Sequence, residues 1–126
     1  MKKYQFVSGM LLLLLACESS KSDEIRIFIP GTYTRFSDHE MRKEYDTIKI
    51  KVISETGNNY SMIRSSSFQR KLDGKEFPWE YTKEEWTAVY DENSRVLNET
   101  RKGKIISFVP EKSILLVGTT EYKKLN

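Results

Sequence analysis

Few residues of this 126-residue chain have the types and spacing that catalysis requires. The chain has one His and one Cys, so a Ser-His-Asp or Cys-His triad would have to use His39. His39 lies between Asp38 and Glu40, where an exposed histidine is a simpler interpretation than a metal ligand. Glu84 and Glu85 are adjacent and could pair as acid and base, but a solvated loop is the favoured interpretation. We predict no enzyme, no metal site and no cofactor.

Aromatic residues are the main candidates for a binding function, since they make up 12% of the chain. In a β-barrel with room inside, inward-facing aromatic side chains would line an apolar ligand pocket, and in a filled barrel they are core. Our candidates for these walls are Trp79, Trp86 and Tyr90. Arg64 falls on an apparently inward face, where it needs a carboxylate partner or an anionic ligand. A purely structural or outward Arg64 is the alternative.

The amino-terminal segment has the charge order of an export signal. Lys2 and Lys3 precede a short apolar stretch that includes residues 11–15, and Ala16 and Cys17 close it. The apolar run is shorter than the ~20 residues that a membrane-spanning helix needs. Its length instead predicts a signal peptide over residues 1–16.

The residues at the end of this leader carry a more specific resemblance. Leu14, Leu15, Ala16 and Cys17 resemble the lipobox of bacterial lipoproteins. That resemblance implies cleavage before Cys17, thioether lipidation of its sulfur and fatty acylation, for example with palmitate, of the new amino terminus. An ordinary free cysteine behind a cleaved signal is the alternative. Several acyl chains would hold the protein stably on a membrane, whereas one chain binds only marginally.

Residues 17–24 would then connect the lipid to the rest of the chain. The segment after Cys17 has no apolar residue and is typical of a flexible tether, with a reach of about 23 Å. Its acidic residues loosely resemble a surface-export signal of some Gram-negative lipoproteins, and a plain polar linker is the alternative. We expect a lipid-anchored protein of the cell envelope, at the outer membrane. The sequence leaves open whether it lies on the periplasmic face or on the cell-surface face of that membrane.

The charge balance argues against nucleic acid as a partner. The whole chain has 21 basic and 18 acidic side chains, and loss of Lys2 and Lys3 with the leader leaves 19 and 18. A net charge near zero provides no field that attracts a polyanion.

The body of the chain, residues 25–126, is punctuated by turn residues about every ten positions, which is typical of an all-β sandwich or barrel. The breaks fall at residues 30–31, 57–59, 73–74, 91–94, 102–104 and 110–113. Between them, alternation of apolar and polar residues predicts strands over 47–52, 60–68, 77–81, 86–90, 95–100, 105–109 and 114–117, with a closing edge strand over 119–125. Such a series predicts an antiparallel meander of about eight strands that closes into a small barrel, with a β-sandwich as the alternative.

Three places in this pattern are irregular. Ile63 interrupts the alternation in its strand, and a bulge near residues 65–67 would restore it. Ser37 and Glu40 have capping-box spacing, which would suit a short helix after the first strand and ahead of the strand over 47–52. Thr82 and Glu85 have the same spacing, but the aromatic and β-branched residues that follow favour a strand.

Gly31, Thr32 and Tyr33 resemble the Gly-x-Trp start of the first strand in lipocalins and fatty-acid-binding proteins. The order of features also resembles small lipocalin-like bacterial lipoproteins of unknown function. The resemblance implies that Tyr33 plugs one end of the barrel and that Lys123 or Lys124 of the last strand packs across it. Tyr33 thereby joins the candidate ligand-binding residues.

Two non-catalytic functions follow from these observations. In the first, the lipocalin-like domain of a membrane-anchored lipoprotein binds a small apolar or amphipathic ligand inside the barrel. In the second, the domain is an interaction module, a scaffold or an inhibitor, that binds a protein partner at the envelope. A cavity lined by Tyr33, Trp79 and Trp86 would favour the first function. A filled core beside an exposed aromatic surface would favour the second.

Overall fold

A computed structural model describes residues 24–54 and 58–125 of the chain. The expected signal peptide, Cys17 and the tether before Glu24 lie outside the described residues. The strands are β1 Gly31–Asp38, β2 Arg42–Val52, β3 Asn59–Leu72, β4 Lys75–Glu76, β5 Glu80–Asp91, β6 Val96–Glu99, β7 Ile105–Val109, β8 Ile114–Val117 and β9 Thr120–Lys124. A short helix over residues 24–28 precedes β1, and a 3-10 turn spans Pro110–Lys112. In the described residues no helix has the length and apolar character that a membrane crossing requires.

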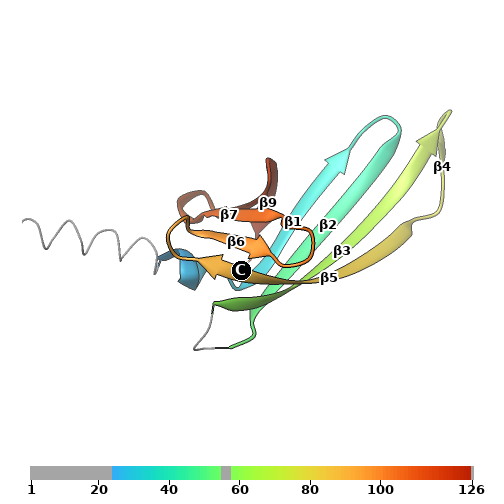
Figure 1. Ribbon diagram of the computed structural model, residues 1–126. Helices are drawn as coiled ribbons and strands as arrows, with labels where there is room; N and C mark the ends of the chain where they lie inside the picture. The colour runs from blue at the N-terminus through green and yellow to red at the C-terminus, as the bar shows by residue number, and fades with distance from the viewer. Residues whose placement is uncertain (1–23, 55–57, 126) are drawn as a thin grey trace, which may run out of the picture.

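The strands form a closed antiparallel barrel (Figure 1). The sheet order is β2-β1-β9-β8-β7-β6-β5-β3-β4, and the additional pairing of β2 with β3 completes a ring of eight strands that leaves β4 outside. The predicted all-β meander is therefore confirmed, and it closes as a barrel rather than as a sandwich. The expected closing strand is β9, which pairs with both β8 and β1.

Alternating burial explains why these residues form strands. Ile48 and Ile50 are buried in β2, while Lys49 and Lys51 face outward. In β5 the same alternation buries Trp86, Ala88 and Tyr90, which confirms the strand there. The turn at residues 73–74 is also confirmed, since Asp73 has a φ of 50° and Gly74 a φ of 76°. Two successive positive φ angles are the conformation of the tightest hairpin turn.

Two of the expected irregularities are different in the structure. The segment at Ser37 and Glu40 is not helical, because it forms the end of β1 and the hairpin turn into β2. In that turn the His39 N–H donates to the Arg42 carbonyl at 2.8 Å, so hairpin hydrogen bonds replace those of a helix. The expected bulge near residues 65–67 is also absent, because β3 keeps one continuous register with both β2 and β5. Ile63 needs no bulge, since it lies half-buried on the outer side.

The interruption lies at residues 77–79 instead, where we expected a strand. Lys71 pairs with Glu76, and Phe68 pairs with Glu80. Residues 77–79 therefore lie opposite only two residues of β3, 69 and 70. Pro78 stands in this segment, and proline has no N–H to donate to a ladder. The interruption shifts the register between β4 and β5 by one residue.

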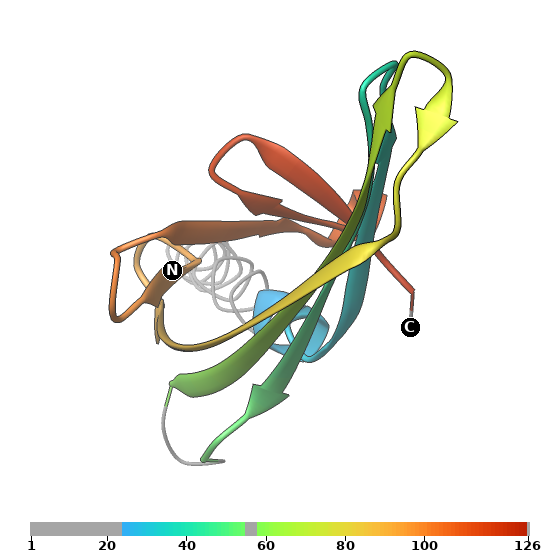
Figure 2. The ribbon, with the colours of Figure 1, turned by 90° about the vertical axis from the view of Figure 1, so that its right-hand side faces the viewer.

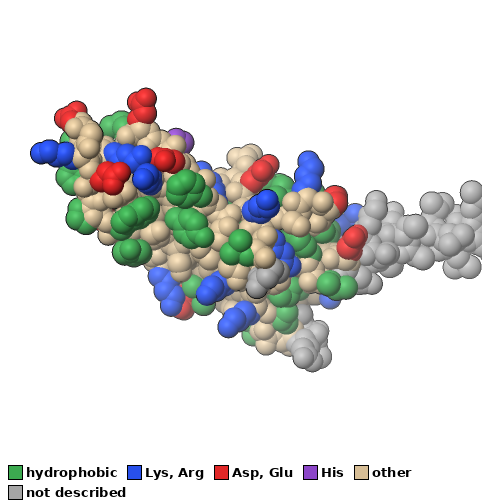
Figure 3. Space-filling view, turned by 180° about the vertical axis from the view of Figure 1, so that it is seen from behind, with side chains coloured by type: hydrophobic (Ala, Val, Ile, Leu, Met, Phe, Trp, Pro, Cys, Tyr) green, Lys and Arg blue, Asp and Glu red, His purple; other side chains and the backbone are tan. Residues whose placement is uncertain are grey.

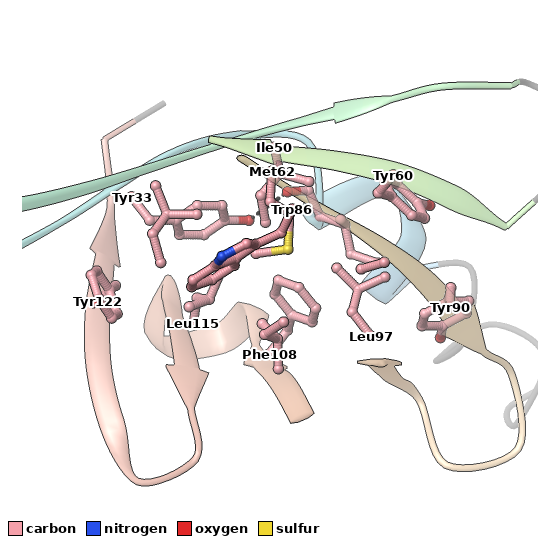
Figure 4. Close-up of a cluster of buried hydrophobic side chains, with 14 residues drawn as sticks. Tyr33, Ile50, Tyr60, Met62, Trp86, Tyr90, Leu97, Phe108, Leu115 and Tyr122 are labelled. Atoms are coloured by element: carbon pink, nitrogen blue, oxygen red, sulfur yellow. Dashed lines mark hydrogen bonds between the residues drawn. The ribbon is translucent and has the colours of Figure 1, made fainter. Parts of the chain in front are cut away.

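Buried side chains fill the interior of the barrel (Figure 4). The fourteen of the core are Ile29, Tyr33, Ile48, Ile50, Tyr60, Met62, Trp86, Ala88, Tyr90, Leu97, Ile106, Phe108, Leu115 and Tyr122. The labelled side chains in Figure 4 come from opposite walls and point into the space between them. These side chains pack as the hydrophobic core of the barrel.

The helix over residues 24–28 closes one end of the barrel. The Tyr33 hydroxyl donates to the carbonyls of Phe28 and Ile29, each at 2.8 Å, and satisfies the end of this helix. Burial raises the pKa of this hydroxyl well above its usual range. Lys124 lies across Tyr33 and the helix, with its Nζ 4.3 Å from the centre of the Phe28 ring and 5.7 Å from the centre of the Tyr33 ring. The arrangement implied for Tyr33 and a carboxyl-terminal lysine is present, and Lys124 provides it.

At the opposite end, long strands project beyond the barrel as an arm (Figures 1 and 2). β1 pairs with β9 only at Tyr33 and Thr34, and β5 pairs with β6 only from Ala88 onward. The remaining lengths of β1, β2, β3 and β5, together with β4, pair only with one another. We call residues 35–47 and 65–83 the arm.

Candidate functional site

The arm carries an exposed aromatic row on its outer face. Phe36 pairs with Tyr45, Tyr45 with Ser67 and Ser67 with Tyr81, so the four residues form one line across the sheet. The exposed fractions are 61% for Phe36, 43% for Tyr45 and 78% for Tyr81. The Phe36 and Tyr45 rings contact each other with centroids 6.4 Å apart. Ser67 leaves a gap between two tyrosines.

That gap is a shallow hollow with a volume of about 340 Å³. Tyr45 and Tyr81 form its sides, and Ser65 and Ser67 lie between them. Small hydroxyl-bearing residues between aromatic rings provide both apolar area and hydrogen-bonding groups, which is typical of binding surfaces.

A second hollow, of about 610 Å³, lies at the tip of the arm. Exposed Met41, Leu72 and Phe77 line it together with Pro78. A space-filling view shows hydrophobic side chains gathered over the arm with charged side chains among them (Figure 3). An apolar surface of this kind on a water-facing sheet is unusual unless something binds it.

Arginines and their carboxylate partners line the inner face of the arm. The Arg42 guanidinium lies 4.0 Å from the centre of the Phe68 ring, and its Nε lies 2.7 Å from Glu44 Oε1. The Arg70 guanidinium lies 5.9 Å from the centre of the same ring, and Arg70 pairs with Glu80 at 3.5 Å. Arginines that stack on an aromatic ring and pair with carboxylates cover this face of the arm.

The mouth of the barrel, where the arm begins, holds a cluster around Asp46, which is 4% exposed. Asp46 Oδ2 lies 3.2 Å from Arg64 Nη2 and 3.8 Å from Arg35 Nη1. The Tyr122 hydroxyl donates to the same oxygen at 3.3 Å. Burial raises the pKa of Tyr122, and the Asp46 charge raises it further. Arg64 thus has the carboxylate partner that its inward position requires, which favours a structural role for it.

Breaking this cluster is expected to destabilise the protein. Asp46→Ala should lower the free energy of unfolding by about 2–3 kcal/mol, because it leaves Arg64 inside the mouth without its partner. The loss is smaller than for a fully buried pair, since 28% of the Arg64 side chain is exposed. Urea unfolding of the full chain measures it.

The matched control for this experiment is Glu80→Ala. Glu80 pairs with Arg70 on the exposed arm, where 53% and 67% of the two side chains are accessible. Its removal should change the free energy of unfolding by less than about 0.5 kcal/mol. Equal effects of the two variants would contradict the structural role of Asp46.

The structure separates the residues that we expected in one pocket. Tyr33, Trp86 and Tyr90 belong to the core, with exposed fractions of 0%, 7% and 2%. Arg64 lies at the mouth. Trp79 lies outside the core on the arm and is 39% exposed. The expected cavity between Tyr33, Trp79 and Trp86 is therefore not formed by these residues, because Trp79 stands on the projecting sheet.

Sequence reasoning assigned no role to several residues that now define a surface. Phe36 and Tyr45 are out of phase with the buried residues of their own strands, Tyr33 in β1 and Ile48 in β2, so alternation already puts them on the outer face. Tyr81 is likewise out of phase with Trp86 in β5. What alternation does not reveal is that these strands continue beyond the barrel.

His39 lies in a hairpin turn, and the paired glutamates lie in a strand. The His39 ring lies 2.7 Å from Ser37 Oγ in the hairpin turn. Glu84 and Glu85 lie in β5 rather than in the loop that we considered, and their side chains point to opposite faces. Within residues 24–54 and 58–125, no group of three His, Cys, Asp or Glu side chains is placed to hold a metal ion.

Comparisons with known proteins give no relative: no family model, no curated protein and no solved structure matches this chain.

Proposed function

We propose that this chain is a membrane-anchored, non-catalytic interaction module that binds a protein partner through the arm. The observation that carries the proposal is the pairing of a filled barrel with an exposed aromatic row. The interior that a small apolar ligand would occupy holds core side chains, so the second of the two functions is favoured over the first. Exposed aromatic rings, with tyrosine prominent among them, are typical of protein interfaces.

The position of the first described residues supports a protein rather than the anchoring membrane as the partner. The helix over residues 24–28 lies at the closed end of the barrel, and the arm projects from the other end (Figure 1). In our proposal a lipid on Cys17 holds the closed end near the bilayer through a tether of about 23 Å. The arm then points away from that membrane and toward other envelope proteins.

Site-specific photocrosslinking in the host cell tests this proposal. A photoreactive residue at Phe36 or at Tyr81 is expected to form the same adduct with one partner protein. The matched control position is Ile105, which is 55% exposed on the barrel wall in β7 and should form no such adduct. Tyr45→Ser should weaken the adduct from Phe36, because the two rings contact each other.

Two results would overturn the proposal. One is an adduct of equal yield from Ile105, since the contact would then be non-specific. The other is the absence of any adduct from both arm positions in cells that express the chain at its natural level.

A further inference from the structure

One side of β5 has no partner strand along the arm. β5 pairs with β3 from Glu80 to Val89, but its pairing with β6 begins only at Ala88. Between Glu80 and Trp86, no strand of the described chain covers the other side. Tyr81, Lys83 and Glu85 are all strongly exposed, with 78% of Tyr81, 63% of the Lys83 side chain and 71% of the Glu85 side chain accessible.

Two hydrogen bonds fix which backbone groups point to this free edge. The Tyr90 N–H donates to the Asn58 carbonyl on the β3 side, and the Thr87 carbonyl accepts from the Thr100 N–H on the β6 side. Because backbone groups alternate in direction along a strand, even-numbered residues of β5 bond to β3 and odd-numbered residues point away. The N–H and C=O groups of Tyr81, Lys83 and Glu85 therefore face outward together.

Two hollows flank the end of this edge. One, of about 490 Å³, and another, of about 460 Å³, share Glu85, Trp86 and Arg101 among their lining residues. They lie where β5 separates from the turn between β6 and β7. A strand added beside residues 81–85 of β5 would lead into these hollows before it reached β6, which pairs with β5 only from Ala88.

We propose that the free edge of β5 accepts an extended segment of the partner protein as an additional antiparallel strand, from Tyr81 to Glu85. This inference rests on the proposed function and specifies how the arm binds. Extended peptides commonly bind to exposed sheet edges, where backbone hydrogen bonds supply affinity and alternate side chains supply specificity. Charged residues on an edge discourage indiscriminate pairing. Lys83 and Glu85 pair with each other at 3.6 Å, and a segment with an acid and a base two positions apart could pair with both in turn.

A second copy of this chain offers the same pattern of charges, but each central register of self-pairing brings like charges together. Antiparallel self-pairing that keeps the faces of the sheet aligned allows three such registers. Two of them place Lys83 opposite Lys83 or Glu80 opposite Glu84, and the third pairs Lys83 with Glu85 but places Glu84 opposite Glu84. Like charges directly opposite each other destabilise a strand pair. The free edge of β1 is also less suitable, because only Phe36 and Asp38 point outward there.

A synthetic peptide tests the inference on the isotope-labelled full chain. The blocked peptide Val-Lys-Thr-Glu-Thr-Tyr-Thr places its Glu opposite Lys83, its Lys opposite Glu85 and its Tyr opposite Tyr81. We expect saturable NMR shifts confined to residues 80–86 and to the flanking turn at Arg101. We also expect the amide exchange of Tyr81, Lys83 and Glu85 to slow by about tenfold at saturation.

Backbone methylation separates strand addition from simple side-chain contact. N-methylation of the peptide's Glu removes an N–H that faces β5 and should abolish the shifts. N-methylation of the following Thr removes one that faces solvent and should leave them. In the chain, Lys83→Pro removes an outward N–H without touching the ladder to β3, and Lys83→Ala is its matched control. Only the proline variant should lose peptide binding completely.

The outcomes are distinguishable from those of the crosslinking experiment. The absence of shifts at millimolar peptide, or equal loss of binding with both methylated peptides, would overturn strand addition. If arm crosslinks persist in that case, the partner binds the arm through its face and the proposed function stands. If the arm forms no crosslinks, the proposed function fails whatever the peptide does.

Discussion

Replacing Trp86 with alanine is expected to lower the free energy of unfolding by about 3–5 kcal/mol, the usual cost of deleting a buried aromatic side chain. Trp86 is 7% exposed and packs among the core side chains. Its Nε1 donates to Glu84 Oε2 at 3.0 Å, and Lys104 Nζ lies 4.3 Å from its ring. The substitution removes a large apolar contact and also leaves Glu84 without this donor. Urea unfolding of the full chain, followed by far-UV circular dichroism, measures the change.

The second tryptophan is a matched control for the first. Trp79 lies on the arm, outside the core, and is 39% exposed. Trp79→Ala should therefore change the free energy of unfolding by less than about 1 kcal/mol. A wild-type urea midpoint for Trp86→Ala, or equal losses for the two variants, would show that Trp86 is not a core residue.

Cys17→Ser is expected to abolish incorporation of a clickable fatty acid and to leave the precursor uncleaved. The reason is chemical, since the proposed anchor is a thioether and serine has no sulfur. Metabolic labelling in the host, with gel mobility of the precursor, measures both effects. Ser19→Ala is the control, because it alters the tether but keeps Cys17, and it should be labelled normally. Normal labelling of Cys17→Ser would remove the anchor from the proposed function.

Most of the barrel could be predicted from the sequence because its strands obey a simple rule. Where one face of a strand is buried, apolar residues alternate with polar ones, and β2 and the inner half of β5 follow this pattern. The strands β7 and β8 begin and end at the expected residues, because Lys104 and Pro110 and the turns around them limit the apolar runs.

The arm could not be predicted, because alternation says nothing about how far a strand has neighbours on both sides. Phe36 and Tyr45 are out of phase with buried Tyr33 and Ile48, but the pattern does not show that they stand on a sheet outside the barrel. Trp79 was assigned to the same wall as Trp86, but Pro78 interrupts the strand between β4 and β5 and the tryptophan follows the arm. The candidate site therefore depends on tertiary pairing, which only the structure provides.

The narrow seam between β1 and β9 has a consequence for how the molecule reaches its native state. It joins only two residue pairs, Tyr33 with Lys124 and Thr34 with Lys123, across roughly 90 positions of the chain. Such a distant junction forms slowly compared with the neighbouring hairpins, since its loop must close first. A ribosome-bound fragment that lacks β9 cannot complete the cylinder. The ring can therefore shut only after residues 120–124 have been made, so closure of the cylinder is a late step of folding.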